Sequence, residues 1–160
     1  MELYRDISMS FPEDIWSLDV VSRYFRTHVF SEAAILDERR YFLRAALFVP
    51  IEDGSDFVWG VWCEVSQKDH DRYLKAYVEE KTGEMAPISG QLANELPCYE
   101  GSLNLRVKLI PNPFGRPKVQ IIGDSTLKDD QLKGISLKKL EELNSVLFGD
   151  DEEEAESIEP

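Results

Sequence analysis

The amino-acid sequence predicts one α+β domain over residues 1–148, followed by a disordered acidic tail over residues 149–160. We expect an antiparallel sheet of about four to five strands, with two or more helices packed on one face. Three observations lead to this prediction. Aromatic and β-branched runs flank short polar turns, apolar stripes recur at helical spacing behind capping residues, and the last residues are almost all acidic.

Two hairpins account for most of the predicted sheet. Residues 41–50 and 57–65 are rich in aromatic and β-branched side chains and surround a polar turn. Apolar and polar residues alternate over 103–109, which is typical of a half-buried strand, and residues 118–122 form the returning strand. The turn between these two strands has Pro at its second position and Gly at its fourth, in the segment Asn112-Pro113-Phe114-Gly115. A further short element is expected around residues 91–96.

The first hairpin also leads to a prediction of which residues face each other across its two strands. If paired residue numbers sum to about 108, Arg44 faces Glu64 across the two strands, as an ion pair that contributes roughly 0.2–1 kcal/mol. In the same register Phe48 covers Gly60, which shields the exposed backbone of that glycine.

Three segments have helical patterns. After Pro12, apolar residues recur at near-helical spacing (Ile15, Leu18, Val21, Phe25), although a strand fits residues 20–25 almost as well. Ser66 and Asp69 resemble a capping box ahead of an apolar stripe that we expect in the core, with Gly83 ending the helix (Tyr73, Leu74, Tyr77, Val78). Ser136 is placed to cap a last helix with a leucine face (Leu137, Leu140, Leu143, Leu147).

The charge balance restricts the partners. The chain has 31 acidic and 18 basic residues and a net charge of −13, and without the seven acids of the last eleven residues it is still −6. No cluster of Lys and Arg is visible along the sequence, so we expect neither nucleic acid nor membrane as a partner. Solubility alone is the favoured interpretation of this charge, and attraction of a basic protein partner is the alternative.

Neither end of the chain suggests export. The first residues lack a basic segment followed by an apolar run, and the longest apolar run, residues 45–51, is too short to span a bilayer. The sequence therefore predicts a cytoplasmic protein in which Cys63 and Cys98 are free thiols. Cys63 shares a strand face with Trp59 and Val61 and is expected to be buried, whereas Cys98 follows Pro97 in a loop.

No catalytic, cofactor or metal signature is present. Asp69-His70-Asp71 contains one of two histidines, but neighbours on a helix point in different directions, so we expect a solvated helix start. The neighbours of Cys98 include Glu95 and Glu100, which disfavour a reactive thiolate. The sequence contains no glycine-rich phosphate-binding loop and no nucleophile elbow. Hydrolysis by a pair of carboxylates stays an open alternative, because the 31 acids allow many pairs. Trp59 and Trp62 point to opposite faces of their strand, and core positions are the favoured interpretation.

Several segments resemble a bacterial family known as domain of unknown function 2199. The resemblance runs from about residue 10 to 148 and rests on Trp59-Gly-Val-Trp62 and Leu103-Asn-Leu105 above all, with Asp37 to Pro50, Leu92 to Tyr99 and Gly115-Arg-Pro117 in support. Many members of that family begin with a Cys-x-x-Cys-Gly-x-x-His stretch typical of a metal site, which this sequence lacks. The family name carries no activity, and it implies a bacterial, cytoplasmic, stand-alone domain.

Three functions stay open. The first is a non-enzymatic immunity protein, antitoxin-like, that neutralises a basic toxin by covering its active site through acidic contacts (Asp69, Asp71, Glu79, Glu80, Glu95, Tyr99, Glu100). The second is an enzyme or small-molecule-binding domain with a pocket on one sheet face (Arg44, Trp62, Glu64, Asn94, Asn104). The third is a regulatory adaptor for a host partner, and the oligomeric state is left open in all three.

Overall fold

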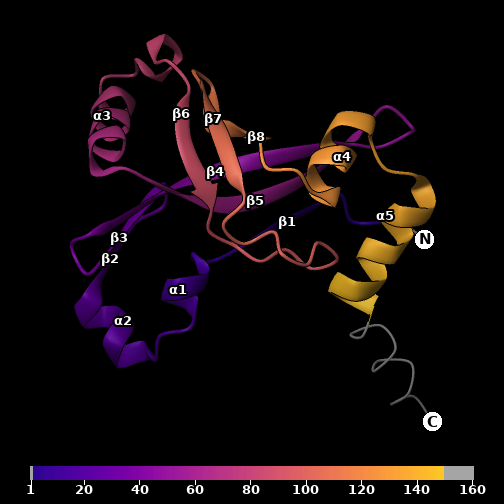
Figure 1. The fold of residues 1–160 in the computed structure, drawn as a ribbon, viewed down its shortest axis with the longest axis horizontal. Helices are drawn as coiled ribbons and strands as arrows, with labels where there is room; N and C mark the ends of the chain where they lie inside the picture. Colours follow the sequence, from indigo (N-terminus) through magenta and orange to yellow (C-terminus); the bar gives the residue numbers. More distant parts are fainter. Residues whose placement is uncertain (1, 150–160) are drawn as a thin grey trace.

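The computed structural model describes residues 2–149, so the predicted acidic tail after Gly149 lies outside the described residues. The strands are β1 (Asp6–Ser8), β2 (Thr27–Val29), β3 (Ala33–Leu36), β4 (Arg40–Pro50), β5 (Asp56–Val65), β6 (Ile88–Leu92), β7 (Arg106–Asn112) and β8 (Gly115–Ile121). The helices are α1 (Glu13–Trp16), α2 (Val20–Arg26), α3 (Gln67–Val78), α4 (Thr126–Lys133) and α5 (Leu137–Asn144), with a 3-10 turn at Thr82–Glu84 and a π-helical turn at Ser145–Gly149. Figure 1 shows their arrangement.

Strands β4 to β8 close into a five-stranded barrel. Each strand pairs antiparallel with the next one along the chain, and β8 returns to pair parallel with β4, where Lys118 lies opposite Ala46. An odd number of alternating strands can close only with one parallel pair, because the first and last strands run in the same direction. The α+β class is confirmed, and the predicted antiparallel sheet of four to five strands is a mixed barrel of five strands to which three further strands are added.

The remaining strands extend the barrel because β4 and β5, which pair with each other, are long enough to hold two further partners each along their other edge. On one edge of β4, β3 pairs with residues 40–43 and β8 pairs at Ala46. On one edge of β5, β1 pairs in parallel with residues 58–60 and β6 pairs with residues 63–64. β2 continues beyond β3 and forms an end of the sheet.

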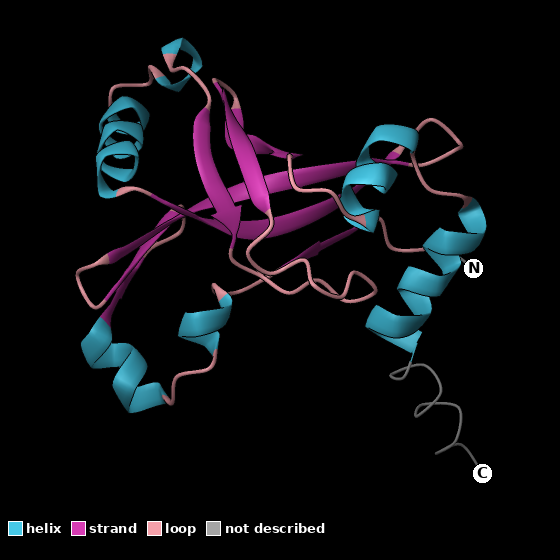
Figure 2. Ribbon diagram, in the orientation of Figure 1, coloured by secondary structure: helices cyan, strands magenta, loops and turns pink. Residues whose placement is uncertain are grey.

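The core fills the barrel and both of its ends. Odd-numbered residues of β4 and β5, such as Leu47 and Trp59, point into the main apolar cluster, while Phe42 and Trp62 join a second cluster on the outer face. Tyr73 of α3 and Leu140 of α5 also belong to the main cluster. Figure 2 shows α3 at one end of the barrel strands and α4 with α5 at the other. The helices therefore cover opposite ends, and the prediction that they share one face is wrong.

The first hairpin is confirmed, but its predicted register is wrong by two residues. Paired numbers sum to 106, so Arg44 lies opposite Trp62 and Phe48 opposite Val58. The turn is shorter than expected, because Ile51 N–H donates to the Ser55 carbonyl at 2.8 Å. A shift of two residues keeps every side chain on its predicted face, and the alternating pattern therefore could not reveal it.

The helix predictions are confirmed in part. The N-terminal helix is broken into α1 and α2, because the Asp19 carboxylate accepts a hydrogen bond from Ser22 N–H and starts a new helix there. Ser66 and Ser136 cap their helices as predicted. The helix that Ser66 begins ends at Val78, before Glu80 with a φ of 57°, so Gly83 lies beyond it in the 3-10 turn. α4, capped by Ser125, was not predicted.

Burial along the predicted apolar stripes also differs from the expectation. Tyr73 is buried, but Tyr77 and Val78 are exposed. Leu140 and Leu143 of α5 are buried as expected, whereas Leu137 is exposed. The Asn112–Gly115 turn joins β7 to β8 as predicted.

Gly90 permits the close crossing of β6 over β5. A Cβ at this position would lie 2.5 Å from the Glu64 carbonyl oxygen and 3.1 Å from Val65 Cγ1. We expect Gly90→Ala to lower the free energy of unfolding by about 1–3 kcal/mol, because the two strands must separate. Gly115→Ala is the control, since its Cβ would meet nothing nearer than 3.9 Å. Urea unfolding compares the two, and equal stability of both variants would contradict the close crossing.

Candidate functional site

An arm of residues 12–38 extends from the barrel, to which β3 attaches it, and carries the largest group of exposed apolar side chains in residues 2–149. It contains α1, α2, β2 and β3, at the lower left of Figure 1. No residue of α2 is buried. The exposed large apolar side chains of the arm and their exposed fractions are Tyr24 80%, Phe25 78%, Val20 77%, Val21 66%, Trp16 58%, Phe30 46% and Val29 38%. Contiguous apolar exposure of this kind marks interaction surfaces, because water contact with it is unfavourable.

Arg23 fixes the inner side of the arm. Its guanidinium donates to the carbonyl oxygens of Trp16 and Leu18, each at 3.0 Å. The same group lies 4.6 Å from the centre of the Phe11 ring and 5.7 Å from that of Trp16. The turn between α1 and α2 is therefore held by a side chain that is itself directed inward.

A second set of contacts ties the arm together and to the barrel. Arg26 binds Asp37 through two hydrogen bonds, at 2.8 and 2.7 Å, and so joins the end of α2 to the end of β3. The Asn94 side chain accepts from Trp62 N–H and donates to the Phe11 carbonyl, each at 2.8 Å. The polar groups of the arm thus hold its shape; α1 and β3 bury Ile15, Ala34 and Leu36 against the barrel, and the apolar side chains of α2 are left to solvent.

The surface of the arm includes a shallow hollow and a strand edge. The hollow has a volume of about 690 Å³ and is lined by Phe11, Val20, Arg23, Tyr24, Thr27, His28, Val29 and Phe30. β2 pairs on one side with β3, and within residues 2–149 no strand pairs with its other side. The arm therefore offers apolar contacts beside free backbone groups.

The charge of the arm is negative. It contains six carboxylates against two arginines, a net charge of −4 (Glu13, Asp14, Asp19, Glu32, Asp37 and Glu38 against Arg23 and Arg26). Both arginines are engaged within the arm, as described above. Hydrogen bonds from Ser22 lower the pKa of Asp19, and the contact with Arg26 lowers that of Asp37. The apolar patch is thus bordered by ionised carboxylates at neutral pH.

The residues of the predicted pocket have structural contacts in this fold. Arg44 lies over the Trp62 ring, 5.3 Å from its centre, and Trp62 is 1% exposed and donates from Nε1 to the Met9 carbonyl. Glu64 binds Arg40 at 2.8 Å instead of Arg44. Asn94 is buried and makes the two hydrogen bonds described above. Asn104 lies in a turn with a φ of 73°, and its backbone N–H donates to the Leu92 carbonyl.

The predicted acidic contacts fall in two separate places. Asp71, Glu79 and Glu80 are exposed on and after α3 and Asp69 is partly exposed, but residues 67–81 also contain four basic residues, so this surface is mixed in charge. In the other segment Glu95 and Glu100 are exposed. Tyr99 is buried, because its ring packs against Trp59 and its hydroxyl donates to Asp130 at 2.6 Å. An exposed side-chain contact at Tyr99 is therefore excluded.

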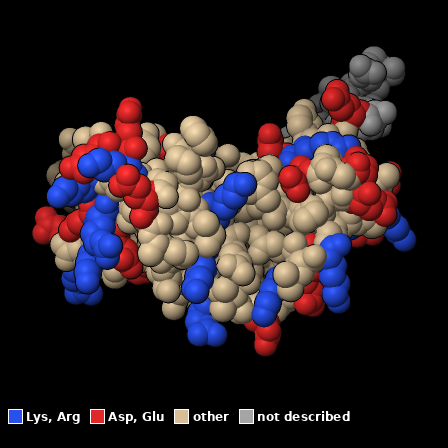
Figure 3. Space-filling view, turned by 90° about the horizontal axis from the view of Figure 1, so that it is seen from above, with Lys and Arg blue, Asp and Glu red and all other residues tan. Residues whose placement is uncertain are grey.

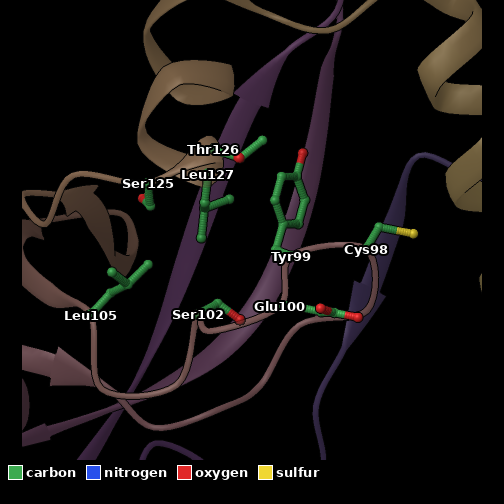
Figure 4. A pocket seen from close by; sticks show the side chains of 8 residues that line it. All are labelled: Cys98, Tyr99, Glu100, Ser102, Leu105, Ser125, Thr126 and Leu127. Atoms are coloured by element: carbon green, nitrogen blue, oxygen red, sulfur yellow. The ribbon is translucent and has the colours of Figure 1, made fainter.

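Cys98 borders a pocket of about 370 Å³ beneath the start of α4, shown in Figure 4. The other lining residues are Tyr99, Glu100, Ser102, Leu105, Ser125, Thr126 and Leu127. The Cys98 sulfur points away from the Tyr99 ring in this view. Partial burial raises the pKa of this thiol above its ordinary value of 9.0, and the nearby Lys139 offsets that effect only in part. The geometry gives no activated nucleophile.

Alkylation tests the state of both thiols. We expect iodoacetamide to modify Cys98 slowly at pH 7.5 and faster as the pH rises through 9, because the thiolate is the reacting form. Cys63 should stay unmodified in the folded chain, since it is fully buried and burial raises its pKa. Mass spectrometry at several pH values follows both sites, with Cys98→Ser as the control. Rapid modification of Cys98 with a midpoint below pH 8 would contradict this assignment.

His70 is buried, so the prediction of a solvated helix start is wrong for this residue. Its ring packs against Tyr41 with centres 5.0 Å apart, and Nδ1 lies 2.9 Å from an Asp71 carboxylate oxygen. Among residues 2–149, Nε2 has no hydrogen-bond partner.

No group of three or more His, Cys, Asp or Glu side chains suited to a metal ion occurs within residues 2–149. Trp59 and Trp62 are both buried, as predicted.

The arm escaped the sequence prediction because its pattern was assigned to the core. Val20, Val21, Tyr24 and Phe25 are apolar on more than one side of a helix. A short helix with such a pattern cannot bury all of its apolar residues against one neighbour, and this was the available signal.

These features define a class: a small α+β protein with a five-stranded mixed barrel, helices at both barrel ends and an exposed apolar arm. The chain belongs to the family described as an uncharacterized protein conserved in bacteria, domain of unknown function 2199, whose model matches residues 2–135. Comparisons with curated proteins and with solved structures gave no significant match. Within the described residues, no helix has the length and apolar character needed to cross a membrane.

Proposed function

We propose that this protein is a binding module without catalytic activity of its own, and that its arm docks a basic protein partner. The observation that carries the proposal is the exposed apolar surface of α2 and its neighbours, presented on a segment that hydrogen bonds hold in place. A preorganised surface loses little conformational freedom on binding, so its apolar contacts contribute more fully to affinity.

The composition of the arm supports a protein as partner. Trp and Tyr are the residues that most often dominate binding energy at protein interfaces, and the arm exposes Trp16 and Tyr24 together with Phe25. Protein interfaces combine an apolar centre with a charged rim, and the rim here is negative. Electrostatic attraction between this rim and a basic partner would speed association and weaken with added salt.

The immunity function is a narrower form of the same proposal. It identifies the basic partner as a toxin whose active site the arm would cover. α3 lies at the same end of the barrel as the arm in Figure 1, so its carboxylates (Asp69, Asp71, Glu79, Glu80) can border such a partner. A regulatory adaptor would use the same surface for a different partner. A ligand site at Arg44 and Glu64 would require the segment that carries Met9 to leave Trp62, which favours protein binding over that alternative.

A comparative capture experiment tests the proposal. Tagged wild-type protein and the variant Tyr24→Ser/Phe25→Ser are incubated with lysate of the source bacterium, washed at low and high salt, and the bound proteins are identified by mass spectrometry. Tyr77→Ser/Val78→Ser is the matched control, because it removes two exposed apolar side chains from α3. We expect one basic protein to be retained by wild type and control, to be weakened by salt, and to be lost from the arm variant. Equal retention by all three would contradict the arm as the binding surface.

A further inference from the structure

A basic surface is assembled on the outside of the barrel from four strands. β4, β6, β7 and β8 contain no Asp or Glu, although the chain has 31 acidic residues. Six cations point outward from these strands, and one of them, Arg40, is paired with Asp14 and Glu64. The other five form the surface that we call the basic wall (Arg44, Arg106, Lys108, Arg116 and Lys118). Four of its members belong to one stretch, residues 106–118, and Arg44 is distant in the sequence; uncharged residues separate the four, so they do not form a continuous run of Lys and Arg.

The strand registers place these cations side by side. Lys118 lies opposite Ile110 on β7 and opposite Ala46 on β4. Lys108 lies between Gln120 and Ser89 on the neighbouring strands. The parallel pairing of β8 with β4 brings Arg116 close to Arg44, and repulsion from Arg116 adds to burial in lowering the pKa of Arg44.

Most of these charges have no acidic partner. Within residues 2–149, no carboxylate lies at ion-pair distance from Arg44, Arg106, Lys108 or Lys118, whereas Arg116 binds Glu32 at 3.0 Å. In Figure 1 no helix lies in front of β6 and β7, and α4 lies beside β4 and β8. Figure 3 views the molecule from above: single basic side chains stand on the largely uncharged middle of this face, and acidic and basic side chains are mixed toward the two ends. Like charges held together without counter-charges favour an anionic ligand.

We propose that the basic wall binds the acidic C-terminal segment of the same chain, residues 150–160. This segment contains seven acids and no Lys or Arg, so its charge complements the wall. The proposal concerns a surface other than the arm and is independent of the proposed function.

The length of the segment suits this contact. Eleven residues reach about 36 Å when extended. The path from Ala46 along β4, across the Ile51–Ile135 bridge and along α5 with the following turn amounts to roughly 45 Å, and the direct separation is shorter because this path bends. A segment joined to the same chain has a high effective concentration, in the millimolar range for short flexible links, so weak ionic contacts suffice.

A single-stranded nucleic acid fits the wall less well. Surfaces that bind such strands combine cations with several aromatic side chains on which bases stack. The strands of the wall offer Phe48, whose ring is already covered by Lys118, with Nζ 5.1 Å from the ring centre, and the turn between β7 and β8 adds the exposed Phe114. The net charge of −13 also opposes approach of a long polyanion.

Carbodiimide crosslinking of the full chain tests the proposal, because it joins carboxylates to lysines that touch them. At low salt we expect the carboxylates of residues 150–159 to link to Lys108 and Lys118 at least about tenfold more than to Lys68 and Lys75, which are exposed on α3. The links should disappear at about 0.5 M salt, where charges are screened over a few ångströms. A mixture of isotopically heavy and light chains shows whether they form within one molecule.

Two variants and a second readout complete the test. Glu156→Gln/Glu159→Gln, which neutralises the acids nearest the end of the segment, should shift the backbone amide resonances of residues 106–110 and 118–120, and Lys108→Ala/Lys118→Ala should abolish the links. Crosslinks spread evenly over exposed lysines, links only between molecules, or unshifted amide resonances would each overturn the proposal. If the wild-type chain and the glutamine variant bound an oligonucleotide with the same affinity, the proposal would be overturned as well, because the C-terminal segment would then not occupy the wall.

Discussion

Replacing Tyr24 and Phe25 together with serine is expected to weaken binding of the captured partner by at least about a hundredfold. The two rings are among the most exposed side chains of the chain, and they lie edge to face with their centres 5.2 Å apart. Aromatic anchors at the centre of an interface contribute about 2 kcal/mol or more each, and 1.4 kcal/mol corresponds to a factor of ten. Calorimetric titration of the purified pair measures the change.

The same substitution should leave the fold intact. Neither side chain is buried, so the free energy of unfolding should change by no more than about 0.5 kcal/mol. Tyr77→Ser/Val78→Ser is again the control and should bind as wild type does. If both double variants bound the partner with wild-type affinity, the apolar patch would have no part in recognition. If the arm variant unfolded, the patch would be structural, contrary to its exposure.

Asn94→Ala is expected to lower the free energy of unfolding by about 2–5 kcal/mol. The Asn94 side chain is 1% exposed and satisfies two backbone groups, Trp62 N–H and the Phe11 carbonyl. Alanine leaves both groups without partners, and each buried unsatisfied group costs about 1–3 kcal/mol. The contact also joins the barrel to the start of the arm, so partner binding should weaken in parallel. Urea unfolding followed by tryptophan fluorescence gives the stability.

Asn104→Gly provides the comparison for this effect. Asn104 is exposed and has a φ of 73°, a conformation that glycine adopts without strain. We expect the free energy of unfolding of the Asn104→Gly variant to stay within about 0.5 kcal/mol of the wild-type value. If Asn94→Ala lowered the free energy of unfolding no more than Asn104→Gly does, the buried Asn94 amide would not be what holds the arm to the barrel.

Local patterns predicted the elements better than their arrangement. The alternation in β4, β5, β7 and β8 and the capping serines Ser66 and Ser136 each depend on neighbouring residues, and they were predicted correctly. Closure of the barrel depends on the contact of Lys118 with Ala46, which are 72 positions apart, and no local pattern records it. α4 was missed because its apolar residues are few, with only Leu127 buried.

The surfaces were harder to predict for a similar reason. Apolar residues such as Tyr24 and Phe25 were expected in a core, since burial is the usual outcome for such side chains. The basic wall draws its charges from three separate segments that only the strand registers bring together. Net charge alone pointed to acidic contacts on α3, where four basic residues turn out to balance four acids over residues 67–81.

The measurement that tests the docking role of the arm most directly is amide hydrogen exchange of the full chain, with and without the captured partner. We expect slower exchange in residues 16–30 on binding, with smaller changes elsewhere, because these residues carry the exposed apolar side chains and the free edge of β2. Protection confined to α3, to residues 95–100 or to the basic wall, with exchange unchanged in residues 16–30, would contradict the assignment of the arm as the binding surface.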